Sequence, residues 1–252
     1  MTPPEVRIIG ITAMPEIRTG DDLAGMIVDA VEAQGTGFLN GDILVVTQKV
    51  VSKAEGRLVA LSDVEPSSFA QTIADRYDKD ARHVEVVLRE SRRIVRMDHG
   101  VIITENRLGH ICANSGVDAS NVETQGVLAL LPEDPDRSCQ DLRSEVLRRT
   151  NAEVAVIMSD TFGRPWREGC TNVAIGVAGI DPLIDYSGQE DPSGFVLRVS
   201  VLAIADELAS AAELVMGKMD RVPAAIARGY PYPQAQGSSS SLIRPPDKDL
   251  FR

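Results

Sequence analysis

The sequence is poor in aromatic residues and in positive charge. Phe, Trp and Tyr together make up 4% of its 252 residues, and Trp166 is the single tryptophan. Proteins that bind single-stranded nucleic acid stack successive bases on aromatic side chains, and this chain offers no ladder of them. Its formal net charge of -11 would also repel a phosphate backbone. We therefore expect no nucleic-acid partner.

Cysteine, histidine and long apolar runs are also scarce. The three cysteines are odd in number and widely spaced, as expected of reduced thiols rather than of disulfides or a zinc site. The three histidines show no HExxH-like spacing, so oxygen atoms would have to hold any bound metal. No apolar run approaches the roughly 20 residues that cross a bilayer, and residues 1–5 lack a secretory pattern. We expect a cytoplasmic protein without a membrane partner.

The remaining composition, 43% hydrophobic and 25% charged, is ordinary for a globular protein of one large or two small domains. Apolar runs predict strands at residues 6–13, 42–47, 100–104, 127–131, 153–158, 172–178, 183–186, 195–201 and 223–228. Helical spacing predicts helices at residues 21–34, 66–77, 136–149 and 204–216, and we interpret residues 83–97 as a further helix. The mixture predicts an α+β fold over residues 1–252, built as two interleaved subdomains.

The usual phosphate-binding motifs are absent, because neither GxxxxGK[ST] nor a GxGxxG between a strand and a helix occurs. Polar clusters at the ends of predicted elements are the remaining candidates. In the first, residues 47–53, Lys49 and Lys53 would meet phosphate oxygens, and a solvated strand-to-loop junction is the alternative. In the second, residues 104–109 and 114–121, Asp118 and Asn121 supply the oxygen ligands that magnesium prefers, or they only shape turns.

The third cluster, residues 159–169, is the strongest candidate. Asp160 and Thr161 follow a predicted strand and precede Arg164 and Arg167, a combination that suits a metal ion and a phosphate group together. Pairing of the arginines with surface carboxylates is the alternative. The fourth cluster, residues 216–223, follows a helix that Gly217 is expected to end, and capping alone would explain it.

Taken in order, these motifs resemble the coenzyme F420-0:L-glutamate ligase family, the γ-glutamyl ligases of deazaflavin coenzyme biosynthesis. The resemblance extends from about Val6 to Phe251, so it covers nearly the whole chain. The residues that carry it are Met14-Pro15-Glu16, Lys49-Val50-Val51-Ser52-Lys53, Ile103-Thr104-Glu105-Asn106-Arg107-Leu108-Gly109, Gly116-Val117-Asp118, Ser120-Asn121, Asp160-Thr161 and Trp166-Arg167.

The resemblance implies a homodimeric ligase that uses GTP to add L-glutamate to coenzyme F420-0 or its dehydro form, with Mg²⁺ or Mn²⁺ and with K⁺ as a further candidate ion. It implies that Asp118, Asp160 and Thr161 hold metal. It places the nucleotide among Met14, Pro15, Glu16, Ile17, Gln48, Lys53, Asn121, Met216, Gly217, Lys218, Met219, Asp220, Arg221, Val222 and Pro223. At the positions of Gln48 and Lys218, relatives carry other polar residues. A fused C-terminal flavin reductase domain, found in some relatives, has no counterpart in these residues, so we expect no second activity.

Such a ligase activates a carboxylate as an acyl phosphate, and cations then carry much of the catalysis by offsetting phosphate charge. All three substrates are anionic, so a chain of net charge -11 needs a locally positive cleft. Lys53, Arg164 and Arg167 are the expected catalytic cations, with Lys49 and Arg107 as further candidates for the cleft. Two alternatives stay open at this stage. One is a related amide ligase for another carboxylate, and the other is a nucleotide-binding regulatory protein without turnover.

Overall fold

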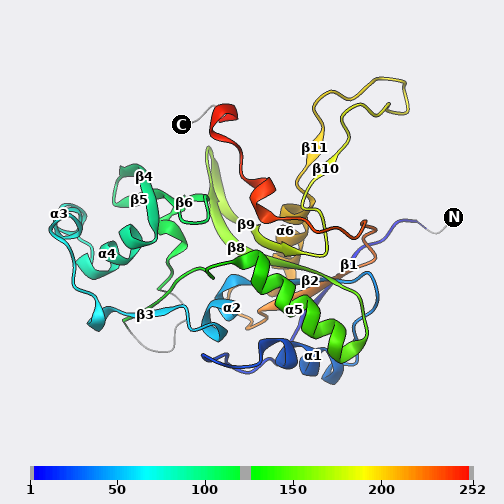
Figure 1. Cartoon of the computed structure of the whole chain (residues 1–252), viewed down its shortest axis with the longest axis horizontal. Coiled ribbons are helices and arrows are strands. Elements are labelled where there is room, and N and C mark those ends of the chain that lie inside the picture. Colours follow the sequence, from blue (N-terminus) through cyan, green and yellow to red (C-terminus); the bar gives the residue numbers. More distant parts are fainter. Residues whose placement is uncertain (1–2, 120–125, 250–252) are drawn as a thin grey trace.

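The computed structural model describes residues 3–119 and 126–249, and it confirms the expected α+β class. The largest sheet has five strands in the order β1 (Arg7–Ile11), β12 (Ala224–Arg228), β2 (Ile43–Thr47), β8 (Ala155–Arg164) and β9 (Arg167–Ala178). Its β2–β8 pair is parallel, whereas its other neighbouring strands are antiparallel. The carboxyl end of β2 therefore lies beside the middle of β8, at one edge of the sheet (Figure 1).

Helices cover both faces of this sheet (Figure 1). On one face, α1 (Leu23–Ala33) and α5 (Pro135–Thr150) pack over a core that includes Leu44 of β2. On the other, α6 (Ile204–Met216) packs over a second core that includes Ile43. Successive side chains of a strand point to opposite faces, so a continuous apolar run such as β2 is stable only between two such layers.

Capping residues define where these helices begin and where α6 ends. Asp22 and Asp134 accept backbone N–H bonds at the first turns of α1 and α5, which satisfies donors that have no partner within the helix. Asp206 and Glu207 lie in the first turn of α6, where the helix dipole favours negative charge. Gly217 ends α6 at φ +56°, a conformation that glycine adopts without strain.

A second group of elements, between residues 58 and 129, lies beside the large sheet (Figure 1). It contains β3 (Leu58–Ala60), α3 (Ser68–Tyr77), α4 (Ala81–Arg89), β4 (Ser91–Asp98), β5 (Val101–Asn106), β6 (Ile111–Ala113) and β7 (Val127–Ala129). Strands β4, β5 and β6 form one antiparallel sheet, and β3 pairs with β7. This group has a core of its own, with Ile73, Val87, Ile102 and Leu128 buried together.

Two peripheral segments complete the described chain. Strands β10 (Ile184–Asp185) and β11 (Val201–Leu202) form a ribbon whose connection projects from the body (Figure 1). The C-terminal segment carries the short turns η3 (Ser239–Leu242) and η4 (Pro246–Lys248), and two more such turns are η1 (Leu61–Asp63) and η2 (Asn114–Gly116). Within residues 3–119 and 126–249, no helix combines the length and apolar character that crossing a membrane requires.

Two predicted elements are wrong. The predicted helix at residues 83–97 is instead the end of α4 followed by β4, because the chain beyond Glu90 pairs with β5, and that pairing overrides local helix preference. The predicted strand at residues 195–201 is mostly irregular. There the Asp191 carboxylate accepts the N–H groups of Ser193 and Phe195, which holds a turn in place of a strand.

Two polar clusters expected in loops lie in regular structure. The first belongs to α2 (Gln48–Ala54), which follows β2 without a loop and buries Val51 in the main core. The third belongs to the hairpin of β8 and β9, in which Asp160 pairs with Val173 and Thr161 with Asn172. Side chains held by a helix or a strand are positioned more firmly than loop side chains, which favours a preorganised site.

Candidate active site

Polar side chains gather where the parallel pair of β2 and β8 ends. Thr47 and Ser159 are the last paired residues of the two strands. After Thr47 the chain turns into α2, whereas after Ser159 it continues along β8 to Asp160. This arrangement brings the first turn of α2, with Lys49, next to Asp160. Open sheets commonly bind ligands at the carboxyl ends of parallel strands, and the second and third clusters of the sequence meet at this edge.

A β-bulge lies at the same point. The register of β8 and β9 shifts between Met158, which pairs with Gly176, and Ser159, which pairs with Ala174. Bulges change the direction of the side chains that follow, and here the following residue is Asp160. Gly176 is needed beside the bulge, because a Cβ there would lie 2.7 Å from the backbone of Pro135 in α5. The buried Ser159 hydroxyl has no hydrogen-bond partner among the described residues.

Asp118 and Asp160, 42 residues apart in sequence, lie close enough to repel each other. Burial raises the pKa of Asp160 to about 6, with the Asp118 charge acting in the same direction and the charges of Lys49 and Lys218 against it. Asp118 pairs with Lys49 at 2.7 Å, and Asp160 accepts the Thr161 N–H at 2.8 Å. Two carboxylates that share a site with ammonium groups form a pair of oxygen donors that favours positive charge between them.

Thr161 belongs to an adjoining network that links β8, β9 and the end of α6. Its hydroxyl donates to Asn172 Oδ1 at 2.8 Å and accepts a hydrogen bond from Lys218 Nζ at 2.6 Å. Lys218 also pairs with Glu213 at 2.9 Å, and Asn172 donates to Glu213 at 2.8 Å. The network places the fourth polar cluster, which starts at the end of α6, against the third.

The oxygen atoms in these two networks fit the metal that the resemblance implies. Asp118 and Thr161 are each contacted by a lysine ammonium group, and carboxylate and hydroxyl oxygens are the donors that Mg²⁺ and Mn²⁺ prefer. Among the described residues, no three His, Cys, Asp or Glu side chains are arranged as a metal-binding group. A metal held by Asp118, Asp160 and Thr161 would therefore need water or phosphate oxygens to complete its shell, as Mg²⁺ commonly does.

The expected nucleotide residues surround α2 on two sides. Lys53 is buried and forms an ion pair with Glu16, while Ile17 packs in the main core near Val51. Gln48 is buried and accepts a hydrogen bond from the Ser52 hydroxyl at 2.8 Å. Asn121 lies outside the described residues.

The segment that follows α6 reaches the same edge of the sheet. The Pro223 carbonyl accepts the Thr47 N–H at 2.9 Å, one residue before α2 begins. Met216 is buried, whereas Met219 is 89% exposed, so the exposed part of this segment is available to a ligand. The loop after α6 therefore meets the start of α2, whereas Glu16 contacts Lys53 in its last turn.

Arg164 and Arg167, expected as catalytic cations, lie apart from this cluster. They pair with each other at the tip of the β8–β9 hairpin. Arg164 is four residues beyond Asp160, about 13 Å along an extended strand. Its guanidinium donates to the carbonyls of Glu168 and Gly169. The described geometry thus brings Lys49, Lys53 and Lys218 to the site and leaves the two arginines at the hairpin tip.

Several site residues have no signal in the sequence. Asn172 and Glu213 join the Thr161 network, and the bulge buries Ser159 next to Asp160. Cys112 lies near Asp160, and burial together with the Asp160 charge raises the pKa of its thiol to about 12. A hairpin prediction for residues 159–178 would have found Asn172 opposite Thr161. The turn at Arg164–Arg167 does contain Pro165, but its other central residue is the exposed Trp166 at φ +58°, where glycine or asparagine is the usual signal.

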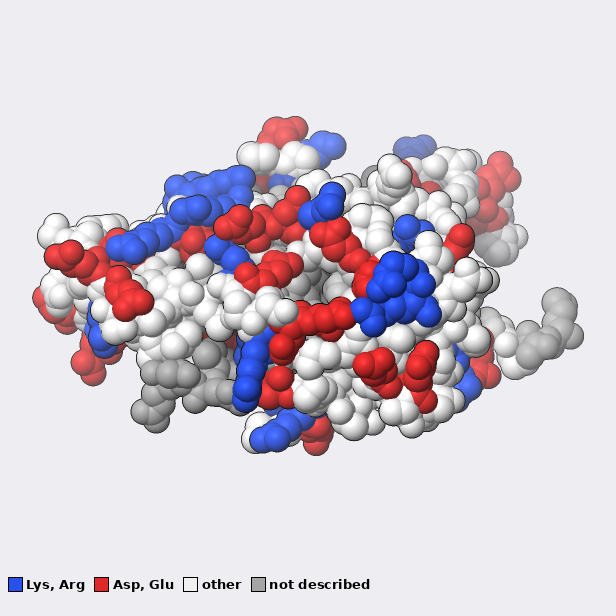
Figure 2. Space-filling model, turned by 60° about the horizontal axis from the view of Figure 1, so that its bottom comes forward, with Lys and Arg blue, Asp and Glu red and all other residues white. Residues whose placement is uncertain are grey.

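The surface charge is locally mixed in spite of the net charge of -11. Figure 2 shows Lys and Arg side chains gathered in separate groups on one face of the molecule, with Asp and Glu side chains around a hollow between them. Positive groups of this kind create local fields that differ in sign from the field of the whole chain. An anionic ligand can therefore be bound in a part of the surface where the cations dominate.

Comparison with known proteins shows the family of this chain. Residues 11–229 match the family model described as F420-0:Gamma-glutamyl ligase. The chain is 45% identical to the Coenzyme F420:L-glutamate ligase of Methanothermobacter thermautotrophicus, over 98% of this chain and 99% of that protein. It is 45% identical to the protein of the same name from Methanopyrus kandleri, over 99% and 98% of the two chains, and 40% identical to that from Archaeoglobus fulgidus, over 98% and 96%. The chain therefore belongs to the F420-0:gamma-glutamyl ligase family.

Proposed function

We propose that this protein ligates L-glutamate to coenzyme F420-0 or its dehydro form, with GTP as the co-substrate. The observation that supports the proposal most directly is the convergence of Asp118, Asp160 and Lys49 at the carboxyl end of a parallel strand pair. The names of the relatives supply the substrates, since each relative is a Coenzyme F420:L-glutamate ligase.

The proposed chemistry runs in two steps. An oxygen of the F420-0 carboxylate attacks the γ-phosphorus of GTP, and the bond to the β-phosphate oxygen breaks, giving an acyl phosphate and GDP. The glutamate amine, after losing a proton, then attacks the acyl carbon, and inorganic phosphate leaves as the amide forms. Both steps move negative charge between oxygen atoms, so the lysines at the site stabilise them mainly by electrostatics and positioning.

The residues of the site have distinct proposed roles. Asp118, Asp160 and Thr161 would hold Mg²⁺ or Mn²⁺, and K⁺ is an additional candidate ion. A divalent metal held there would supply positive charge that offsets the charge of the phosphate oxygens. Residues 14–17 with Gln48, Lys53 and the loop after α6 would surround GTP, and Lys53, released from Glu16, would contact phosphate oxygens.

Assembly is also part of the proposal. We place the whole activity in residues 1–252, with the group between residues 58 and 129 as an inserted subdomain that completes the site by contributing Asp118. The protein would work as a homodimer. Support for a self-associating surface comes from the ribbon of β10 and β11, where Phe195 and Val199 are 63% and 90% exposed.

A reconstitution with purified components tests the function. F420-0, L-glutamate, GTP and Mn²⁺ are incubated with the protein, and the products are analysed by mass spectrometry alongside phosphate release. We expect a product heavier by one or more glutamyl residues, more turnover with GTP than with ATP, and no turnover after chelation. Retention of nucleotide without phosphate release would instead identify a regulatory binding protein. Ligation of glutamate to another carboxylate, with F420-0 unchanged, would identify a different amide ligase.

A further inference from the structure

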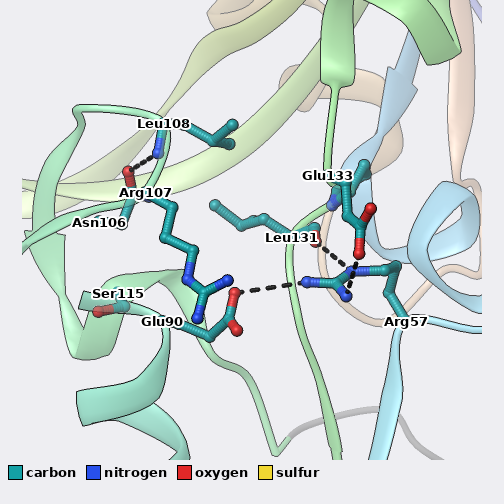
Figure 3. A pocket seen from close by; sticks show the side chains of 9 residues that line it. Arg57, Glu90, Asn106, Arg107, Leu108, Ser115, Leu131 and Glu133 are labelled. Carbon is teal, nitrogen blue, oxygen red and sulfur yellow. Dashed lines mark hydrogen bonds and ion pairs between the residues drawn. The ribbon is translucent and has the colours of Figure 1, made fainter. Parts of the chain in front are cut away.

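A small charged pocket lies between the segment before α5 and the group of elements at residues 58–129 (Figure 3). None of its lining residues is among the proposed metal and nucleotide residues. Its volume is about 270 Å³. Cavities that enclose drug-sized ligands run from about 300 to 1,000 Å³, so this pocket suits a smaller metabolite than a nucleotide or a deazaflavin. The side chains that give it its charge are Arg57, Glu90, Arg107 and Glu133, and Asn106 and Ser115 form its inner wall.

Arg107 presents an oriented guanidinium to this pocket. Its Nε and Nη2 atoms both donate to the Arg89 carbonyl, at 3.0 and 2.7 Å. A guanidinium carries five N–H donors, so donors remain for a ligand once the group is fixed in this way. Figure 3 shows the Arg107 side chain extending into the pocket toward Glu90. A fixed planar fork of donors suits a carboxylate.

Arg57 presents a second guanidinium from the opposite side (Figure 3). Its Nε is held by the Leu131 carbonyl at 3.0 Å, which leaves the terminal nitrogens for other partners. These nitrogens contact Glu133 at 3.0 Å and Glu90 at 3.4 Å. The Glu133 side chain is 81% exposed, and exposed ion pairs contribute little free energy. A ligand carboxylate can therefore replace Glu133 on Arg57 at low cost.

The inner wall leads from the pocket toward the carboxylates of the site. The buried Asn106 amide oxygen accepts the N–H groups of Leu108 and His110, each at 3.0 Å, and its Nδ2 lies 3.9 Å from Cys112 Sγ. Cys112 is itself near enough to Asp160 for the Asp160 charge to raise the pKa of its thiol. Ser115, on the same wall, lies three residues before Asp118. Through Asn106 and Cys112, this wall of the pocket reaches the neighbourhood of Asp160.

We propose that this pocket is the subsite of the incoming amino acid, and that Arg57 and Arg107 each bind one carboxylate of an α-amino dicarboxylic acid. The inference rests on the proposed function, under which the amino acid is L-glutamate. With its carboxylates on the two guanidiniums, the amino group faces the wall of Asn106 and Ser115, which is the side nearest Asp160. Glu90 lies between the guanidiniums and balances part of their charge.

A site with two guanidiniums leads to a prediction about which amino acids are substrates. Replacing the side-chain carboxylate of glutamate by an amide or a methyl group leaves one guanidinium without an anionic partner, so glutamine and alanine should be poor substrates. Shortening the side chain to that of aspartate should also weaken binding, because the positions of both guanidiniums are fixed by backbone carbonyls.

The test compares Arg107→Gln with a matched control, Arg92→Gln. Arg92 is also an exposed arginine and lies in β4, which pairs with β5, the strand just before Arg107. Its contact with Glu105 is long, at 3.9 Å. Two assays are run with F420-0 and GTP. One measures ligation over a range of L-glutamate concentrations, and the other replaces glutamate with hydroxylamine, which traps an acyl phosphate as a hydroxamate. The trapping assay requires no amino acid, so it reports phosphoryl transfer alone.

For Arg107→Gln we expect the KM for L-glutamate to rise by about 10- to 100-fold, as expected when a hydrogen-bonded charge is lost. Hydroxamate formation and the KM for GTP should stay at the wild-type level, and Arg92→Gln should match the wild type in both assays. Arg107→Lys, which keeps the charge without the fork, should be intermediate. A melting curve confirms that each variant is folded.

The outcomes separate the two hypotheses. If the wild type forms neither hydroxamate nor product, the proposed function is wrong, and the subsite with it. If the wild type ligates glutamate while Arg107→Gln keeps the wild-type KM for glutamate, only the subsite is wrong. Equal losses in hydroxamate formation and ligation would also overturn it, because Arg107 would then act on phosphoryl transfer.

Discussion

At Asp160, the surrounding protein opposes the charge that the proposed chemistry requires. Its pKa is raised to about 6, chiefly by burial and further by Asp118, so the ionised form is unfavourable in the folded chain. Removing the charge in Asp160→Asn should therefore keep or raise the stability of the ligand-free protein. We expect a gain on the order of 1 kcal/mol at pH 7.5, or about 2–4 °C in Tm.

The same substitution should remove activity. An amide keeps one oxygen but lacks the charge that a divalent ion requires, so ligation should fall by on the order of 100-fold or more. The stabilisation that Mn²⁺ and GTP together provide should shrink in parallel. Thermal melts with and without these ligands, and product formation over a metal titration, are the measurements. A variant that melts earlier by about 1 kcal/mol or more yet ligates normally would make Asp160 a structural residue.

The raised pKa of Asp160 also predicts a pH dependence of stability. Its usual value is 3.8, so between about pH 4 and pH 6 the folded protein binds this proton more tightly than the unfolded chain does. The contribution of Asp160 to the free energy of unfolding is therefore present below pH 4 and is lost as pH rises through 6. We expect the loss to be about 1–2 kcal/mol, allowing for partial exposure of the carboxyl group.

Denaturant unfolding of the wild type and Asp160→Asn from pH 4 to pH 8 checks this sign. Glu55 and Asp206 also have pKa values raised by burial, but they are present in both proteins and cancel in the difference. The wild type should lose stability relative to the variant as pH rises from 4 to 6, and the difference should be constant above pH 7. A difference that does not change with pH would show that Asp160 is not protonated in this range.

At the scale of elements, one ion pair joins β12 to the residue just before β2, at the end of these strands opposite the site. Arg228 of β12 donates to both carboxylate oxygens of Asp42, at 2.8 and 2.7 Å, and the Asp42 side chain is 1% exposed. Arg228→Met would leave that carboxylate buried without its cation, with the Leu39 N–H still donating to it. We expect a loss of about 3 kcal/mol, or roughly 6–12 °C in Tm, with little change in the KM values of the ligation.

Arg7 provides the control for this prediction, because it pairs with Arg228 in the register of β1 and β12 but is exposed. Arg7→Met should change Tm by less than about 2 °C. Differential scanning calorimetry of both variants makes the comparison. Equal Tm shifts would mean that the Asp42 pair contributes no more than an ordinary surface charge does.

Elements that are stabilised by their own pattern were predictable from the sequence. The strands β2 and β12 and the helices α1, α5 and α6 have continuous or periodic apolar residues, and their cores lie where that pattern places them. Elements that depend on distant partners were not predictable. Helix α2 carries the polar residues of a loop, β4 is held by β5, and the β8–β9 hairpin continues through polar residues because each strand pairs with the other.

The candidate site shows the same division. Asp118 and Asp160 are singled out in the sequence by their setting, since oxygen ligands in polar clusters suit a hard cation. The ion pair of Asp118 with Lys49 and the charge interaction between the two carboxylates depend on the meeting of β2, β8 and the segment before β7, which no local pattern encodes. The pocket of Arg57 and Arg107 likewise combines residues from separate elements. Residue types were therefore predictable, whereas their assembly was not.

At the scale of the whole molecule, the ribbon of β10 and β11 is the feature that a single chain leaves unexplained. It projects from the body (Figure 1), and apolar side chains along its connection are exposed. A two-stranded ribbon is marginally stable alone in water, and exposed apolar patches commonly mark contacts with another protein. In a homodimer with twofold symmetry the same patch would contribute from both copies, so we propose a second copy of this chain as its partner.

We therefore predict that the double variant Phe195→Glu/Val199→Glu is a monomer, whereas the wild type has twice the chain mass of 27.2 kDa. Both residues lie in the exposed connection, and twofold symmetry would bring four new carboxylates into one interface. Leu214→Glu, on the 86% exposed face of α6, is the control and should remain dimeric. Light scattering after size exclusion gives the masses, and circular dichroism checks folding. A monomeric wild type would refute the homodimer, and a dimeric double variant would place the interface away from the ribbon.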